Sequence, residues 1–238
     1  MQSLRVYFLR GEKVVSVHRE ALVTGTAVAS AAVTALLAGP SGTERAAGIS
    51  TAIPAGTTLT GVRIVDGIAQ VDLGPAYASG GGSLSMTARL MQVVFTLTQF
   101  STVTGVSFAI DGRPTTVLGG EGVIIDTPAT RADFDRFVPP IFIDSPAVGQ
   151  TVTSPVQVSG VANVFEGQFS VELTDATGSV LAKAPALASM GQFTSFTVTL
   201  SFTTPAAGAG QVTGFDNSPK DGSRIAVYDV PVHFGPHG

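Results

Sequence analysis

A change of hydrophobic period near Pro139 and Pro140 divides this chain in two. Before these prolines, stretches of helical period alternate with stretches of period two; after them only short alternating stretches occur, separated by Pro, Gly, Asn and Asp. Two successive prolines cannot continue a helix and favour an extended connector. We therefore expect the 238 residues to form two domains, at residues 1–136 and 137–238.

Two stretches of the first part have a helical period. Ala29, Ala32, Val33, Leu36 and Leu37 form an apolar stripe that ends before Gly39 and Pro40. A longer stretch follows the segment "SGGGSLS", with Ser83 as its expected N-cap and one face made by Leu84, Ala88, Met91 and Phe95. We interpret "GGGSLSM" as a flexible loop; anion binding there is a minor alternative, because the lysine of a phosphate-binding loop is missing.

The strands of the first part are marked by alternation and by two Asp-Gly turns. Residues 4–9, "LRVYFL", alternate as one strand. Asp66-Gly67 and Asp111-Gly112 each separate two alternating stretches, and this dipeptide tolerates the positive φ of a tight hairpin turn. The expected order is strand, helix, hairpin, helix, hairpin. It predicts an α+β domain with two helices packed on a small mixed sheet.

The second part has six or seven strand signals in about 100 residues and no convincing helix. This density of strands is typical of an immunoglobulin-like β-sandwich. The chain contains no Cys and no Trp, which excludes the core of an antibody-type domain.

Composition excludes several classes of function. The formal net charge is −4, and the 13 Lys and Arg are scattered singly, so no basic stripe is available to follow a nucleic acid backbone. Without Cys, the chain has no disulfides and no thiolate zinc sites. No apolar run reaches the roughly 18 residues of a membrane span. No export signal is visible at the start, so we expect that any natural signal has been removed from this sequence.

Several long segments resemble known bacterial families. "LLAGP", "STAIPAGTTLTGVRIVDGIAQVDLG" and "LTQFSTVTGVSFAIDG" resemble the GerMN domain of sporulation and germination proteins. "IDSPAVGQTVTSPVQVSGVANVFEGQFSVELTDATGSVLA" and "FDNSPKDGSRIAVYDVPV" resemble the immunoglobulin-like domain of bacterial spore germination. The resemblance implies an envelope-associated protein, commonly a lipoprotein, whose first domain works in protein assemblies rather than in catalysis. It brings no catalytic residues and no cofactor.

Few residues suggest catalysis or metal binding. No cysteine accompanies His18, His233 and His237 to support a metal site, and no serine lies in a nucleophile elbow. A hydrolase would need a polar cleft with two perturbed acids or a Ser–His pair. Weak calcium candidates are Asp216, Asn217 and Asp221, although Lys220 would oppose a cation.

Glu166, in the stretch "VFEGQFSVEL", is predicted to be structural. An acid among strands is stabilised by hydrogen bonds or by a cation. We expect it to bind the loop at residues 217–224 through backbone N–H groups or through Ser218, Lys220 or Ser223, next to the turn residue Asp221.

These observations predict a non-enzymatic scaffold or interaction protein of the bacterial envelope, outside the cytoplasmic membrane and lipid-anchored in its natural form. Its expected partners are envelope proteins, including other copies of itself bound through the GerMN-like domain. The alternative is an exported binding module for cell-wall glycan or peptide.

Overall fold

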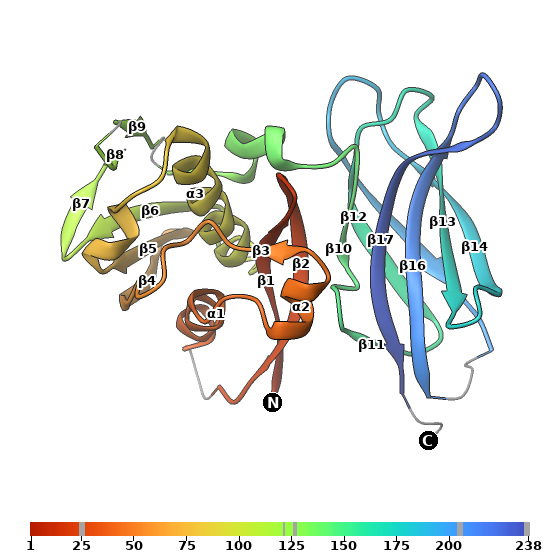
Figure 1. Ribbon diagram of the computed structural model, residues 1–238, viewed down its shortest axis with the longest axis horizontal. Coiled ribbons are helices and arrows are strands. Elements are labelled where there is room, and N and C mark those ends of the chain that lie inside the picture. Colours follow the sequence, from red (N-terminus) through yellow and green to blue (C-terminus); the bar gives the residue numbers. More distant parts are fainter. Residues whose placement is uncertain (24–26, 121, 126–127, 204–206, 236–238) are drawn as a thin grey trace. The chain divides into compact units, whose positions relative to one another are not determined.

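The computed structural model describes residues 1–23, 27–120, 122–125, 128–203 and 207–235 (Figure 1). The chain divides into two compact units. The first contains Met1–Val14 and Arg19–Phe137; the second contains Val15–His18 and Val138–Gly238. The α+β class of the first and the sandwich class of the second are both confirmed.

The amino-terminal strands form a three-stranded sheet. β1 (Gln2–Arg10) lies between β2 (Lys13–Ala21) and β3 (Ile49–Ser50), and β3 pairs antiparallel with it. The sequence predicted β1 but not β2. Four consecutive residues of β2, 14–17, are buried, so this strand lacks the alternation that identifies a half-exposed strand.

The predicted helices are α1 (Val28–Leu37) and α3 (Ser83–Leu97), which contact each other and β1. The expected cap of α3 was wrong. Ser83 is the first helical residue, and the N-cap is Gly82, whose backbone has the required extended conformation without a side-chain bond. A short helix that the sequence analysis missed, α2 (Gly42–Ala46), begins with a capping box between Ser41 and Glu44.

A mixed four-stranded sheet, ordered β4-β5-β6-β7, completes the main architecture of the first unit. Its strands are β4 (Leu59–Val65), β5 (Ile68–Leu73), β6 (Gly105–Ile110) and β7 (Arg113–Thr115). β5 and β6 are parallel, and the other two pairs are antiparallel hairpins. Asp66 and Gly67 lie in the first hairpin turn with φ of 48° and 80°, and Asp111 and Gly112 lie in the second with φ of 52° and 76°. These angles are the positive values that a tight two-residue turn requires.

One face of this sheet is buried. Ala69, Val71 and Leu73 of β5 are all less than 2% exposed, and the ring of Phe108 on β6 stacks on that of Tyr77 at 6.2 Å. β6 contacts α3 and the short helix η1 (Pro75–Ala78), while β4 contacts α1. The remaining elements are β8 (Val117–Leu118), β9 (Val123–Ile124) and the 3₁₀ segment η2 (Arg131–Phe137).

The second unit is a two-sheet sandwich (Figure 1). The smaller sheet has the order β10-β12-β15 and the larger has the order β11-β17-β16-β13-β14. The strands are β10 (Ile141–Ser145), β11 (Thr151–Val152), β12 (Val156–Ala162), β13 (Gln168–Asp175), β14 (Val180–Leu187), β15 (Thr194–Leu200), β16 (Gly208–Asn217) and β17 (Arg224–Phe234). Edge-to-face ring pairs join the two sheets, with Phe142 against Tyr228 at 5.7 Å and Phe169 against Phe196 at 4.9 Å.

β16 is a strand that the sequence analysis missed, because glycine normally weakens a strand. Here the glycines admit neighbouring side chains. A Cβ on Gly210 would lie 2.5 Å from the Phe234 ring, and one on Gly214 would lie 2.7 Å from Ile141. The glycines that weaken the strand signal of β16 in the sequence therefore allow close packing in the core.

Candidate functional site

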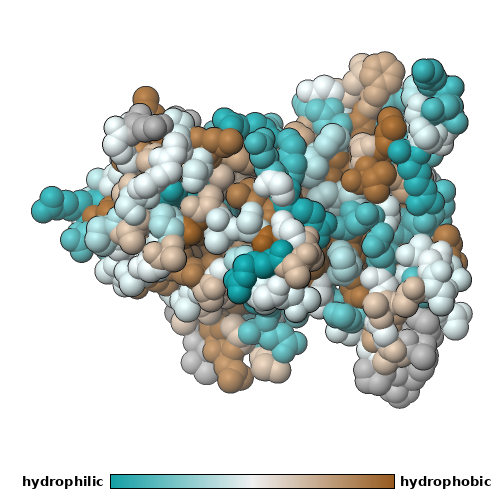
Figure 2. All heavy atoms as spheres, viewed as in Figure 1, coloured by the Kyte–Doolittle hydropathy of each residue, from teal (hydrophilic) through white to brown (hydrophobic). Residues whose placement is uncertain are grey.

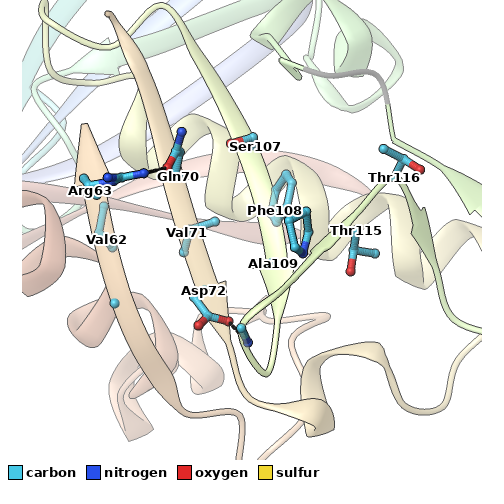
Figure 3. Close-up of a pocket in the computed structure, with 13 residues that line it drawn as sticks. Val62, Arg63, Gln70, Val71, Asp72, Ser107, Phe108, Ala109, Thr115 and Thr116 are labelled. Atoms are coloured by element: carbon cyan, nitrogen blue, oxygen red, sulfur yellow. Dashed lines mark hydrogen bonds between the residues drawn. The ribbon is translucent and has the colours of Figure 1, made fainter. Parts of the chain in front are cut away.

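The open face of the β4–β7 sheet forms a groove with a volume of about 510 Å³ (Figure 3). Thirteen residues of these four strands, of the β6–β7 turn and of the segment after β7 line it. We call this surface the open-face groove. It lies wholly within the first unit.

Strand register arranges the groove's side chains in two rows. Because successive side chains point to opposite faces of a strand, Gln70 and Asp72 face the groove while Ala69, Val71 and Leu73 face the core. Pairing places Arg63 of β4, Gln70 of β5 and Ser107 of β6 in one row (Figure 3). Gly61, Asp72, Ala109 and Pro114 make the next row.

Each charged group in the groove is held by a neighbour. Nε and Nη2 of Arg63 donate to Oε1 of Gln70 at 3.3 and 2.7 Å. The backbone N–H of Gly112 donates to Oδ1 of Asp72 at 3.0 Å. Arg63 Nη1, the Gln70 amide nitrogen, the Ser107 hydroxyl and Asp72 Oδ2 make no hydrogen bond with the described residues. The groove thus presents oriented groups that remain available to a ligand.

This set of groups suits recognition of charged ligands. Among the thirteen described residues that line the groove, Asp72 is the one carboxylate and there is no histidine. Glycosidase-type acid–base chemistry uses two carboxylates in different environments. Arg63 offers a planar cation for an anionic group, and Asp72 offers an anion for a cationic one.

The surface of the first unit is chemically mixed. Over the face of the first unit that Figure 2 presents, hydrophobic residues are separated by polar and neutral ones. The large apolar side chains of this unit that are exposed include Met1, Leu22, Ile64, Val65, Leu84, Val117 and Ile124. Two of them, Ile64 and Val65, lie on the edge strand β4 next to Arg63.

The Gly-rich segment before α3 is held by a buried arginine, which the sequence analysis missed. Arg89 is 2% exposed. Its Nη1 donates to the carbonyl oxygens of Tyr77 and Ser79 at 2.6 and 2.9 Å, and its Nη2 donates to that of Gly80 at 2.9 Å. Burial lowers the pKa of Arg89 and raises the pKa of the Tyr77 phenol. The signal in the sequence was a single Arg immediately before the apolar stretch "LMQVVF".

The prediction for Glu166 was wrong. Its side chain is exposed in the turn that ends at Gly167, and it makes no hydrogen bond or ion pair with the described residues. The glutamate that binds the predicted loop is Glu172, whose two carboxylate oxygens accept from Nη2 of Arg224 at 3.1 and 3.0 Å. The Arg224 guanidinium lies 3.9 Å from the centre of the Phe215 ring. Both glutamates belong to one alternating stretch, but Glu172 lies within β13 whereas Glu166 lies in the turn before it.

The loop between β16 and β17 is organised by its own residues. Ser218 Oγ accepts from the backbone of Lys220 at 3.2 Å, and Asp221 Oδ1 accepts from the N–H and hydroxyl of Ser223 at 3.1 and 2.7 Å. The hydrogen bonds from Ser223 lower the pKa of Asp221, with a further contribution from Ser218. Ser218, Lys220, Asp221 and Ser223 therefore form a turn without help from Glu166.

The weak calcium candidates do not share one loop. Asp216 and Asn217 end strand β16, where Asp216 is 7% exposed and accepts from the backbone N–H of Asn217 at 2.7 Å. Asp221 lies in the following turn, with Oδ1 bonded to Ser223. In the part of the chain that the structure describes, no group of three or more His, Cys, Asp or Glu is placed to hold a metal ion.

The histidines of the described residues lie in strands. His18 is in β2 and His233 is in β17, and the backbone N–H of each donates to a carbonyl oxygen, of Val148 and Gln150 respectively, at 2.9 Å. His237 lies outside the described residues.

No helix in the described ranges has both the length and the apolar character needed to cross a membrane.

Exchanging Glu172 for glutamine is expected to lower the free energy of unfolding by about 1–2 kcal/mol, because a charge-assisted bond becomes a neutral one. The magnitude is limited because the Arg224 side chain is 48% exposed, whereas that of Glu172 is 6% exposed. Glu166→Gln is the matched control and should stay within about 0.5 kcal/mol of the wild-type chain. Urea unfolding of both variants measures the difference; a larger loss for Glu166→Gln would contradict this assignment.

Two family models match separate parts of the chain. Residues 5–116 match the model Germane, described as "Sporulation and spore germination". Residues 140–223 match the model Gmad2, described as "Immunoglobulin-like domain of bacterial spore germination". No curated protein matches the chain.

Solved structures of bacterial proteins are similar to this chain. The first GerMN domain of the sporulation protein GerM from Bacillus subtilis matches with a TM-score of 0.47 and 22% identity, covering 56% of this chain and 100% of that one. The tandem GerMN domains of the same protein match at 0.47 and 17%, covering 86% and 62%. A putative lipoprotein from Clostridium perfringens matches at 0.42 and 24%, covering 56% and 89%.

Proposed function

We propose that this chain, in which a GerMN domain precedes the immunoglobulin-like domain of bacterial spore germination, is a non-catalytic scaffold that binds other proteins of the bacterial envelope. The observation that carries this proposal is the combination of the two domains in one chain. Both family descriptions refer to spore germination. The groups of the open-face groove support it, because they suit recognition of a charged partner.

The scaffold is proposed to work outside the cytoplasmic membrane, in sporulation, germination or general envelope assembly. In its natural form it would be a lipoprotein, and its GerMN domain would bind envelope proteins or further copies of the chain. Exposed strand edges and mixed surfaces are suited to such contacts. A binding module for cell-wall peptide or glycan is the second candidate, favoured by the fixed Arg63 and Asp72 in the groove.

In-cell photo-crosslinking tests the proposal. A photoreactive amino acid is placed at exposed Thr116 on the groove's rim, or at exposed Glu166 on the second unit, and the cells are fractionated after irradiation. We expect the chain in the envelope fraction, crosslinked to the same envelope protein in repeated experiments at one of these positions. Retention on purified peptidoglycan without any protein crosslink would favour the second candidate. A chain confined to the cytoplasmic fraction would contradict both.

A further inference from the structure

The open-face groove carries two opposite charges that do not neutralise each other. Arg63 is oriented by Gln70, and Asp72 is oriented by the backbone N–H of Gly112. These hydrogen bonds keep the charge of Arg63 in one row and the charge of Asp72 in the other, so the groove has a cationic row and an anionic row. Oriented charges of this kind need little reorganisation when a ligand with complementary charges arrives.

The separation of the rows is set by the strand. Gln70 and Asp72 are two residues apart on β5 and face the same side, which places them about 7 Å apart along the strand. An extended peptide has the same repeat, because its side chains at positions i and i+2 also lie on one side at about this spacing. A peptide that lies along the strands would therefore place two of its side chains over the two rows at once.

The floor of the groove leaves room for a peptide backbone. Gly61 and Ala109 occupy the row of Asp72, and a Cβ on Gly61 would meet no other atom within 4 Å. The Ser107 hydroxyl and the Gln70 amide nitrogen, which have no partner among the described residues, are available to peptide carbonyl and N–H groups. In Figure 3 these side chains lie across neighbouring strands on one face of the sheet.

The same lining disfavours a sugar. Binding of a sugar ring by stacking needs an exposed aromatic face. Phe108 is the one aromatic residue among the thirteen described residues of the groove; it is 4% exposed and its ring stacks on Tyr77. Charge and packing therefore favour a peptide over a glycan.

We infer that the open-face groove binds an extended peptide segment with an acidic and a basic side chain two positions apart, the acidic group on Arg63 and the basic group on Asp72. This inference rests on the proposed function and names the kind of segment that the scaffold recognises. The contacts are charge-assisted and solvent-exposed, so the affinity should fall as the salt concentration rises.

The test uses the full chain and three labelled pentapeptides in low salt. Two carry the charged pair in either order, Thr-Glu-Thr-Lys-Thr and Thr-Lys-Thr-Glu-Thr, and the third, Thr-Gln-Thr-Gln-Thr, is neutral; all have blocked ends. Fluorescence polarisation should show binding of at least one charged peptide, at least ten-fold tighter than that of the neutral one. Arg63→Gln and Asp72→Asn should each weaken it about five-fold or more. Lys220→Gln, at an exposed position on the second unit, is the matched control and should leave it unchanged.

A peptide with Glu and no Lys separates the two contacts. Its binding should fall in Arg63→Gln and stay unchanged in Asp72→Asn. Equal binding of all variants, absence of binding at millimolar peptide, or displacement by glycan strands that lack peptide would overturn the inference. A monomer–dimer equilibrium abolished by Arg63→Gln would also overturn it, because the groove's occupant would then be a second copy of the chain. If no peptide binds while in-cell crosslinks to an envelope protein persist, the inference about the groove is wrong and the proposed function stands.

Discussion

Replacing Arg89 by methionine is expected to lower the free energy of unfolding of the first unit by about 2–5 kcal/mol. Methionine fills a similar volume but donates no hydrogen bond. The carbonyl oxygens of Tyr77, Ser79 and Gly80 would lose the partner that satisfies them in the folded state. The loss is smaller than the sum of three bonds because the variant no longer buries a cation.

Local structure should change together with stability. Arg89 fixes the segment between η1 and α3, where Gly81 has a φ of +81° and a Cβ would lie 2.9 Å from Nη2 of Arg89. Hydrogen exchange of the amides at residues 76–86 should therefore speed up more in Arg89→Met than elsewhere in the first unit. Tyr77→Phe removes a single bond, from the phenol to the Arg89 carbonyl at 3.0 Å, and should cost about 1 kcal/mol.

Urea unfolding of the two variants checks these values. Arg113→Met is the matched control, because Arg113 is exposed on β7 and its side chain makes no hydrogen bond or ion pair with the described residues. Its free energy of unfolding should stay within about 0.5 kcal/mol of that of the wild-type chain. Equal midpoints for Arg89→Met and Arg113→Met would show that the carbonyl groups find other partners.

The first unit was largely predictable because its signals are local. The apolar stripes of α1 and α3 appear in the sequence at helical spacing, and the two Asp-Gly turns are determined by neighbouring residues. β2 was missed because it is buried over four successive residues, which removes the alternation that marks a strand. A local pattern identifies an element only where one of its faces is exposed.

Half of the candidate site could also be anticipated from the sequence. Arg63, Gln70 and Asp72 belong to the predicted hairpin at Asp66-Gly67, and the alternation of β5 places Gln70 and Asp72 on its exposed side. Their meeting with Ser107 and Ala109 depends on the parallel pairing of β5 and β6. No local signal specifies this pairing, since about 30 residues and a helix separate the two strands.

The choice between Glu166 and Glu172 has the same physical cause. Both acids occur in one alternating stretch, so each is a reasonable partner for a cation on a neighbouring strand. The turn at Gly167 exposes Glu166, whereas register places Glu172 between Lys183 of β14 and Thr213 of β16. Glu172 lies within β13 and Glu166 lies before it, so the start of the strand separates the two acids, and the alternating pattern alone does not specify where that start falls.

Gly160→Ala is expected to destabilise the second unit by about 2–4 kcal/mol. Gly160 lies inside β12, opposite Ile143 of β10 and Phe196 of β15. A Cβ at this position would lie 1.9 Å from the backbone oxygen of Phe142 and 3.1 Å from the backbone nitrogen of Asp144. These are main-chain atoms, so relief requires β10 to move away from β12 and to lose part of their shared ladder.

The strand pairing around Gly160 determines where the loss of stability in Gly160→Ala should first be detected. The register between β10 and β12 already shifts between Ile143 and Ser145, so this end of β10 is the part most easily separated. Hydrogen exchange should therefore rise first at the amides of β10 and β12, before those of the larger sheet. Gly61→Ala is the control: it also changes a strand glycine, but its Cβ meets no atom within 4 Å, so it should be neutral or stabilising by up to about 1 kcal/mol.

Equal effects of the two alanine substitutions would refute this explanation of Gly160, because both alter backbone entropy in the same way and differ only in the space around the new methyl group. A loss confined to Gly160→Ala would show that the glycine is required by the close approach of two strands. A glycine in an alternating stretch predicts either a bulge or such an approach. Only the position of the neighbouring main chain distinguishes the two, and in β12 that neighbour is the carbonyl oxygen of Phe142.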